Sequence, residues 1–196
     1  MRTAPAIVGL LWAAFVLTWV VLAQFNKKAN RSVHWRTTWG LRLALIVAVF
    51  VIARLQRDAG PAPRLITFIG HPQALHPGAL AQSLGVGLCL AGFGFAFWAR
   101  WHLGRNWGMP MSLRQGHELV TSGPYAYVRH PIYTGIMLAM IGSAVALGFL
   151  WLALFALYFV FFLFSARTEE KMMLAQFPDA YPGYRRRTKM LIPFVL

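Results

Sequence analysis

The longest uncharged run in the sequence limits the folds open to this chain more than any other feature. From Pro131 to Ala166, 36 residues follow one another without a single Asp, Glu, Lys, Arg or His. One helix of that length would measure about 54 Å, whereas the hydrocarbon core of a bilayer is about 30 Å thick. The run is therefore predicted to fold back as an antiparallel hairpin of two membrane helices. Gly142-Ser143 and Gly148 are the candidate positions for its turn.

A hairpin places both of its ends at the same face of the membrane. Arg129 and His130 precede the run, and Arg167, Glu169 and Glu170 follow it. We expect these five ionisable side chains to meet at a lipid boundary, where charge is costly and is usually kept for function. The structural alternative is that the arginines anchor the helix ends, while the glutamates pair with nearby basic side chains.

The composition agrees with a membrane protein. Of the 196 residues, 58% are hydrophobic and only 12% are charged, about half the charged share of a soluble domain. We expect an all-α integral membrane protein forming one domain over residues 1–196, with a C-terminal cytoplasmic helical segment. Its five transmembrane helices are expected at about residues 5–25, 39–53, 79–101, 131–147 and 149–166.

The first apolar segment has two interpretations. A cleavable signal peptide is one, since Val21-Leu22-Ala23 resembles a small-residue cleavage site. The run from Thr3 to Asn26 is longer than a usual signal core, however, and only Arg2 precedes it. We therefore interpret it as the first span.

The net charge of +14 has a topological explanation rather than a nucleic-acid one. With five spans, the first loop, the third loop and the tail share one face and hold 14 of the 19 Lys and Arg. The positive-inside rule places that face, and with it the hairpin mouth, in the cytoplasm. A bias toward Ala, Leu and Arg with few Lys suggests a bacterial source, and hence the inner membrane.

No metal site is expected from the sequence. All six histidines fall in loops or at span ends, no two have the spacing of helical ligands, and the acidic residues number only five. Cys89, the single cysteine, lies in an apolar run and is expected to be a small buried hydrophobe. The glycines of the third span are expected to serve close helix packing, namely Gly85, Gly87, Gly92 and Gly94.

The hairpin mouth suits a ligand that carries both signs of charge. Pro131 is well placed for the first turn of a helix, and Arg129 and His130 stand directly before it. A basic pair beside a helix N-terminus suits a carboxylate or a phosphate. Glu169 and Glu170, on the opposite side, suit an ammonium group or a ribose diol.

Several motifs in the second half of the chain resemble one known family. They are Gly116-His117-Glu118-Leu119-Val120-Thr121-Ser122-Gly123-Pro124-Tyr125, Arg129-His130-Pro131-Ile132-Tyr133-Thr134-Gly135 and Arg167-Thr168-Glu169-Glu170, followed by Phe177, Tyr181 and Tyr184. In order and spacing they resemble the isoprenylcysteine carboxyl methyltransferase family, and its small prokaryotic members in particular. The resemblance covers about residues 100–194.

The resemblance implies a membrane methyltransferase that uses S-adenosylmethionine, with the cofactor enclosed by residues 102–135 and 167–194. It gives catalytic roles toward a lipophilic acceptor to Arg167 and Glu170. It gives cofactor-binding roles to His117, Glu118, Leu119, Val120, Gly123, Tyr125, Arg129, His130, Pro131, Tyr133 and Glu169. The acceptor could be the carboxylate of an isoprenylcysteine-like molecule, a lipid amine or a small thiol.

The chain also departs from the family pattern, and other functions stay open. Pro178-Asp179 stands where the family usually has Gly before an acidic residue, so the wall formed by the tail is expected to differ. The alternatives are a nicotinamide-dependent sterol-type reductase on a related membrane architecture and a non-enzymatic membrane assembly protein. Cofactor binding and cofactor identity distinguish the three.

Overall fold

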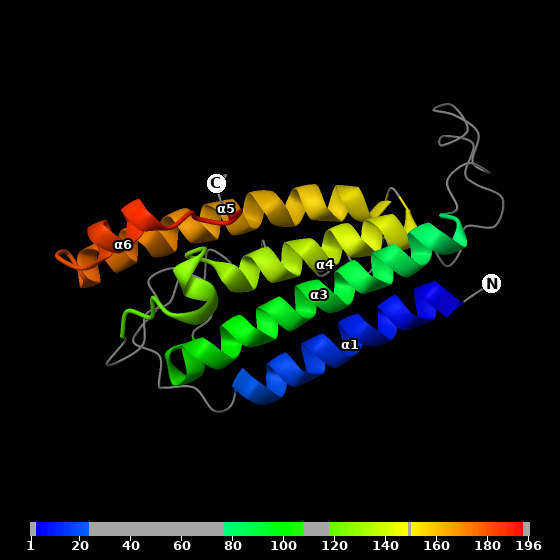
Figure 1. Cartoon of the computed structure of the whole chain (residues 1–196), viewed down its shortest axis with the longest axis horizontal. Coiled ribbons are helices and arrows are strands. Elements are labelled where there is room, and N and C mark those ends of the chain that lie inside the picture. The colour runs from blue at the N-terminus through cyan, green and yellow to red at the C-terminus, as the bar shows by residue number, and fades with distance from the viewer. Residues whose placement is uncertain (1–2, 24–76, 108–117, 149, 194–196) are drawn as a thin grey trace, which may run out of the picture.

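The computed structural model describes residues 3–23, 77–107, 118–148 and 150–193 (Figure 1). Its long helices are α1 (Thr3–Ala23), α3 (Ala79–Leu103), α4 (Pro131–Leu147) and α5 (Leu150–Gln176). The shorter elements are the 3₁₀ turns η2 (Gly104–Asn106) and η3 (Gly123–Ala126) and the helix α6 (Tyr181–Arg187). This part of the chain contains no β-strand, only one isolated bridge between Val128 and Lys189. The predicted all-α class is confirmed.

Three of these helices, α1, α3 and α5, are long and apolar enough to cross a membrane, and α4 is a shorter apolar helix of 17 residues. They support the integral membrane protein that the composition predicted. The expected span at residues 39–53 lies outside the described residues, so the total of five spans stays a prediction.

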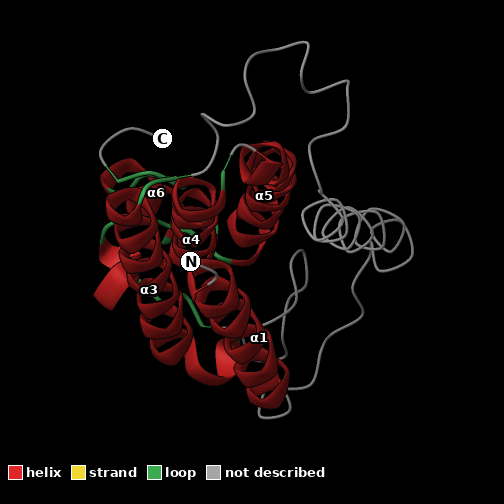
Figure 2. Ribbon diagram, turned by 90° about the vertical axis from the view of Figure 1, so that its right-hand side faces the viewer, coloured by secondary structure: helices red, strands yellow, loops and turns green. Residues whose placement is uncertain are grey.

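The four long helices lie side by side, with α3 between α1 and α4 (Figure 1). The closest pairing is that of α3 with α4, and α5 packs beside α4 (Figure 2). The C-terminal end of α3, the N-terminal end of α4 and the helix α6 are found at one end of the bundle (Figure 1). That end holds the mouth of the hairpin.

Glycines bring α3 and α4 into backbone contact. A Cβ atom at Gly92 would lie 2.5 Å from the backbone nitrogen of Ala139 and 2.5 Å from the carbonyl oxygen of Gly135. One heptad earlier in α3, a Cβ at Gly85 would lie 2.6 Å from the carbonyl oxygen of Gly142. No side chain fits at these positions, and this explains the tight pairing of the two helices.

The packing role predicted for Gly87 and Gly94 is not found among the described residues, because no atom of these residues would lie within 4 Å of a Cβ at either position. They lie on the exposed side of α3. The expectation for Cys89 is confirmed: its side chain is fully buried and its thiol donates to the carbonyl oxygen of Ala139 at 3.2 Å.

The predicted hairpin is confirmed, and its turn falls at one of the two candidate glycines. Gly148 ends α4 with a φ of 107°, a conformation that favours glycine. The expectation of a turn at Gly142-Ser143 is wrong, because both residues lie inside α4 and are buried. Helix α5 continues ten residues beyond Ala166 to Gln176, and so carries Glu169 and Glu170 past the apolar run.

Candidate active site

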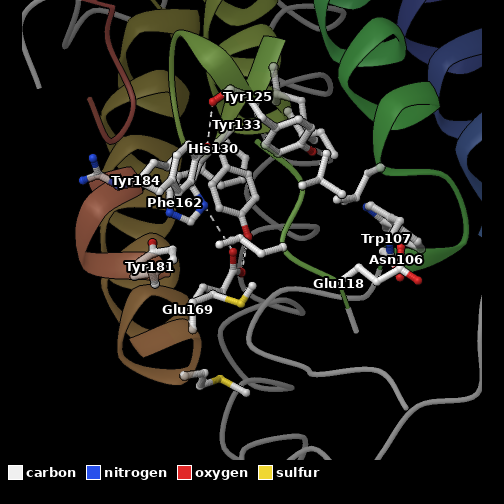
Figure 3. Close-up of a pocket in the computed structure, with 18 of the residues that line it drawn as sticks. Asn106, Trp107, Glu118, Tyr125, His130, Tyr133, Phe162, Glu169, Tyr181 and Tyr184 are labelled. Atoms are coloured by element: carbon white, nitrogen blue, oxygen red, sulfur yellow. Dashed lines mark hydrogen bonds and ion pairs between the residues drawn. The ribbon is translucent and has the colours of Figure 1, made fainter. Parts of the chain in front are cut away.

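A cavity of about 230 Å³ lies at the mouth of the hairpin. One part of its wall is polar, with Glu118, Arg129, His130 and Glu169, while Leu103, Ile132, Ile136 and Phe162 form an apolar part. Trp19 of α1 completes the apolar side. In Figure 3, Asn106, Trp107 and Glu118 lie across the cavity from Tyr181, Tyr184 and Glu169.

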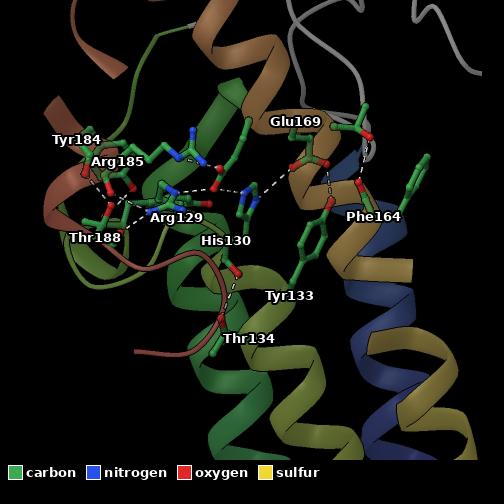
Figure 4. A network of polar contacts seen from close by, with 12 residues as sticks. Arg129, His130, Tyr133, Thr134, Phe164, Glu169, Tyr184, Arg185 and Thr188 are labelled. Atoms are coloured by element: carbon green, nitrogen blue, oxygen red, sulfur yellow. Dashed lines mark hydrogen bonds and ion pairs between the residues drawn. The ribbon is translucent and has the colours of Figure 1, made fainter. Parts of the chain in front are cut away.

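The polar part is built where α4 begins and α5 leaves the apolar run. His130 is the residue that caps α4, and Pro131 takes the first helical position, as the sequence predicted. The Nε atom of Arg129 donates to Oε1 of Glu170 at 2.6 Å, and Nδ1 of His130 lies 3.3 Å from Oε2 of Glu169 (Figure 4). Residues about 40 positions apart in the chain therefore meet as expected.

Three rings connect the polar part of the wall to the apolar part. His130 stacks on Tyr133 with ring centroids 5.6 Å apart, and Tyr133 stacks on Phe162 at 4.6 Å. The hydroxyl of Tyr133 donates to Oε1 of Glu169 at 2.5 Å (Figure 4). Stacking and hydrogen bonding together fix the ring of Tyr133 and the carboxylate of Glu169.

The two carboxylates determine the protonation of His130. Burial alone would lower the pKa of the imidazole, but the hydrogen bond to Glu169 and the negative charges of Glu169 and Glu170 outweigh that effect and hold its pKa above the ordinary value. Protonation is thus favoured by the carboxylates that surround the ring. Oε1 of Glu170 lies 3.8 Å from Nε2 of His130, beyond hydrogen-bond distance.

The C-terminal segment is bound to the start of α4 through its backbone. The backbone N–H of Arg129 donates to the carbonyl of Lys189 at 2.8 Å, and that of His130 donates to the carbonyl of Met190 at 3.1 Å. The guanidinium of Arg129 also donates to the carbonyl of Thr188. These bonds fix the backbone at Arg129 and His130 from outside the hairpin.

Tyrosines connect α6 to the wall that precedes α4. Tyr181 and Tyr184 are buried, and the hydroxyl of Tyr184 donates to the carbonyl of Tyr125 at 2.7 Å. Burial raises the pKa of both tyrosines, so their hydroxyls stay protonated donors. Gly123 begins the turn that carries Tyr125: its φ is 58°, and a Cβ there would lie 2.3 Å from the ring of His102. Glycine is required at this position because the positive φ disfavours other residues and because the ring of His102 leaves no space for a side chain.

Arg100 supports the opposite wall and ties it to α1. Its side chain is 6% exposed and donates to the carbonyls of Gly104 at 2.6 Å and Leu22 at 3.0 Å. The guanidinium lies 5.0 Å from the ring centroid of Trp107, close enough for a cation–π contact. Trp107 and the buried Asn106 line the cavity from this side.

The structure brings together most of the residues selected from the sequence. Those that line the cavity are Glu118, Leu119, Val120, Tyr125, Arg129, His130, Tyr133 and Glu169. Gly123 and Pro131 shape the backbone behind the wall, and His117 lies outside the described residues. Arg167 and Glu170 do not line this cavity but an adjacent cleft. The ligand assigned to each residue stays a prediction.

Sequence reasoning missed eight other lining residues: Trp19, Leu103, Asn106, Trp107, Ile136, Phe162, Met172 and Met173. They are apolar or uncharged, and nothing distinguishes them from core residues until the helices are assembled. Arg185, whose Nε lies 3.4 Å from Glu170, was also missed. Among the described residues, no group of three or more His, Cys, Asp or Glu gathers to hold a metal ion.

Comparison with known proteins gives the family. The model of the phospholipid methyltransferase family matches residues 80–180, more than half of the chain. The chain belongs to this family. The matched region contains α3, α4, α5 and most of the cavity wall, so the fold and the cavity described here are those of a phospholipid methyltransferase family member.

Two of three similar proteins carry methyltransferase names, and the third is named a metal resistance protein. The protein-S-isoprenylcysteine O-methyltransferase of Schizosaccharomyces pombe is 41% identical over 81 residues, 40% of this chain and 34% of that protein. The cobalt-zinc-cadmium resistance protein CzcN of Cupriavidus metallidurans is 35% identical over 94 residues, 46% and 43% of the two chains. The methanethiol S-methyltransferase of Crocosphaera subtropica is 34% identical over 71 residues, 36% and 28%. The matches thus span less than half of each relative.

Proposed function

We propose that this chain is an S-adenosylmethionine-dependent membrane methyltransferase that acts on a lipophilic acceptor. The observation that carries the proposal is the cavity itself. Basic and acidic side chains converge at one part of its wall, and apolar side chains from four helices form another part. The charged part suits a charged cofactor, and the apolar part suits an acceptor that enters from the bilayer.

The residues present fit this cofactor. It carries a carboxylate, an ammonium group, a ribose and an adenine, and when bound it supplies an electrophilic methyl group on a sulfonium. Arg129 and His130 would hold the carboxylate, since Nε2 of His130 is buried and has no hydrogen-bond partner in the described part of the chain. Glu169 would hold the ammonium group. Glu118, Leu119, Val120 and Tyr125 would enclose the adenosine part.

The remaining walls orient the acceptor and exclude water. Trp19, Leu103, Ile136 and Phe162 present apolar surface from α1, α3, α4 and α5, so they favour an acceptor with an apolar body. Transfer of a methyl group gains most from alignment and from a dry site. We propose that the walls supply both, and that the cavity opens on the cytoplasmic side, as the distribution of Lys and Arg indicates.

Two acceptor classes are supported by the names of relatives. The first is the carboxylate of an isoprenylcysteine-like molecule, after the Schizosaccharomyces pombe relative. The second is a small thiol, after the Crocosphaera subtropica relative. The apolar part of the cavity wall favours the first class, because a lipid-like body gives those side chains something to contact.

We assign Glu170 a less direct role than the sequence suggested, and we leave the role of Arg167 unchanged. Glu170 is buried, and its carboxylate accepts from Arg129 and lies next to His130 and Arg185. We propose that it is a positioning residue, holding the two basic groups that face the cavity. Arg167 is exposed at the adjacent cleft, and its predicted role toward the acceptor is kept.

The test is calorimetric binding of S-adenosylmethionine and S-adenosylhomocysteine to the detergent-purified protein, with reduced nicotinamide cofactor as the comparison. We expect saturable binding of the first two, weakened about tenfold to a hundredfold in Glu169→Gln, because one charge-assisted contact contributes about 1.5–3 kcal/mol. Asp179→Asn is the matched control: it removes an exposed carboxylate that does not line the cavity.

Other outcomes identify the other functions. If the protein binds only the nicotinamide cofactor, the proposal is overturned in favour of a reductase. If a folded protein binds none of the three ligands, the result favours an assembly protein. An equal loss of cofactor affinity in Glu169→Gln and in Asp179→Asn would show that the cofactor does not bind in this cavity.

A further inference from the structure

A second hollow, separate from the cavity, lies where α5 meets the C-terminal segment. This basic cleft has a volume of about 460 Å³ and is lined by six basic side chains: Arg129, Arg167, Arg185, Arg186, Arg187 and Lys189. Figure 4 shows Arg129, Arg185 and Thr188 on this side of the polar network, away from Tyr133. Of the described residues, Arg129 is the one that lines both the cleft and the cavity.

The positive charge of the basic cleft is only partly neutralised. Among the described residues on its wall, Glu170 is the one carboxylate, and it already lies 2.6 Å from Arg129 and 3.4 Å from Arg185. Within residues 3–23, 77–107, 118–148 and 150–193, no carboxylate pairs with Arg186, Arg187 or Lys189. A concave surface with this excess of guanidinium groups suits a phosphate, which arginine binds through two parallel hydrogen bonds.

The basic cleft is placed at the depth of lipid headgroups. Arg167 follows Ala166, the last residue of the uncharged run, so the cleft begins where the apolar part of α5 ends. Leu157, Val160 and Phe164 precede Arg167 at spacings of three and four residues, and they therefore share its face of the helix. Their side chains are 41%, 65% and 56% exposed. An apolar stripe thus leads down α5 from the basic cleft.

We propose that the basic cleft binds the phosphate headgroup of an anionic phospholipid, whose acyl chain lies along the stripe formed by Leu157, Val160 and Phe164. The stripe favours a membrane lipid over a free phosphate, because only a lipid has an acyl chain that can contact these apolar side chains. Basic pockets beside transmembrane helices recognise anionic headgroups in this way. The inference does not rest on methyl transfer, since it concerns a different hollow.

The experiment uses the full chain in nanodiscs of phosphatidylcholine, titrated with phosphatidylglycerol, and native mass spectrometry counts the lipid retained. We expect saturable retention of phosphatidylglycerol over phosphatidylcholine, weakened roughly a hundredfold in the double variant Arg186→Gln/Arg187→Gln, because each charge-assisted hydrogen bond to the bound phosphate contributes about tenfold or more. Lys171→Gln is the control: its side chain is exposed just beyond Arg167 on α5 but does not line the basic cleft. In salt that screens the general attraction to an anionic surface, less than a twofold change is expected. Should the double variant fail to fold, Lys189→Gln replaces it, with an expected loss of about tenfold from one charge-assisted contact to the phosphate.

Each alternative result would overturn the proposal. An equal loss of phosphatidylglycerol retention in the cleft variants and in Lys171→Gln would show that the lipid is held by general attraction to a basic surface and not by the cleft. Displacement of the lipid by millimolar inorganic phosphate would identify a soluble anion as the ligand. Equal retention of both lipids would show that the basic cleft does not recognise the headgroup charge.

Discussion

At the scale of single residues, Glu170 is the contact point between the cavity and the basic cleft. Its carboxylate is 7% exposed and lies within 4 Å of three different basic side chains, those of Arg129, His130 and Arg185. A buried charge of this kind is tolerated only when its partners are held in place. Removing it therefore affects the groups that face the cavity, although Glu170 does not line the cavity itself.

Glu170→Gln is expected to lower both stability and cofactor affinity. The variant leaves the guanidinium of Arg129 without its carboxylate, and breaking a buried pair costs about 3–5 kcal/mol. Thermal unfolding in detergent and calorimetric binding measure the two effects. Lys171→Gln, at the next position and exposed, is expected to change neither. Full cofactor affinity with reduced turnover in Glu170→Gln would instead assign this carboxylate to the acceptor.

At the scale of the elements, the pairing of α3 with α4 positions the mouth of the hairpin. Gly85 and Gly92 face Gly142 and Gly135 one heptad apart, with no room for a side chain at any of the four. Because His130 caps the N-terminus of α4, a shift of this helix moves the polar wall of the cavity. Helix packing and site geometry are therefore coupled.

Gly92→Ala is expected to destabilise the protein by about 1–3 kcal/mol, because the added methyl group would meet backbone atoms at 2.5 Å and force the helices apart. Gly94→Ala is the matched control two residues away. It has open space, and with alanine's better helix propensity it is expected to be neutral or stabilising by up to about 1 kcal/mol. Equal melting temperatures of the two variants in detergent would contradict the close contact of α3 and α4.

At the scale of the whole molecule, folding assembles a charge cluster that the unfolded chain does not have. His130 meets Glu169 and Glu170 only when α5 lies against α4, and the C-terminal segment then bonds to the backbone of Arg129 and His130. The carboxylates hold the pKa of His130 above its ordinary value in the folded protein alone. Stability must therefore depend on pH.

The raised pKa predicts the direction of that dependence. The contribution of His130 is fully present below the ordinary histidine pKa of about 6.5 and is lost as the pH rises through the higher folded value. Thermal unfolding measured from mildly acid to mildly alkaline pH is expected to show this loss in the wild type and to show it flattened in His130→Gln. An identical pH profile in the two proteins would contradict the assignment to His130.

Sequence reasoning was most successful where a pattern is local. An uncharged run too long for one span required a hairpin, and the hairpin required Arg129 and His130 to approach Glu169 and Glu170; both are found. Pro131 correctly marked the start of α4, and Gly148 marked its end. Gly142-Ser143 was not the turn, because glycine serves helix contact as well as chain reversal, and the sequence does not distinguish these uses.

The sequence by itself determined the membrane class, the hairpin and the charged cluster at its mouth, because charge and hydropathy act along the chain. Tertiary structure alone decided which side chains face which hollow. Glu170 lines the basic cleft and not the cavity, while Trp19 and Asn106 line the cavity from elements far from the hairpin in sequence. Only the tertiary structure also showed that α4 leaves no space for a side chain at Gly92, whereas no described atom lies close to Gly94. The physical reason is that burial and ion pairing depend on neighbours supplied by other helices.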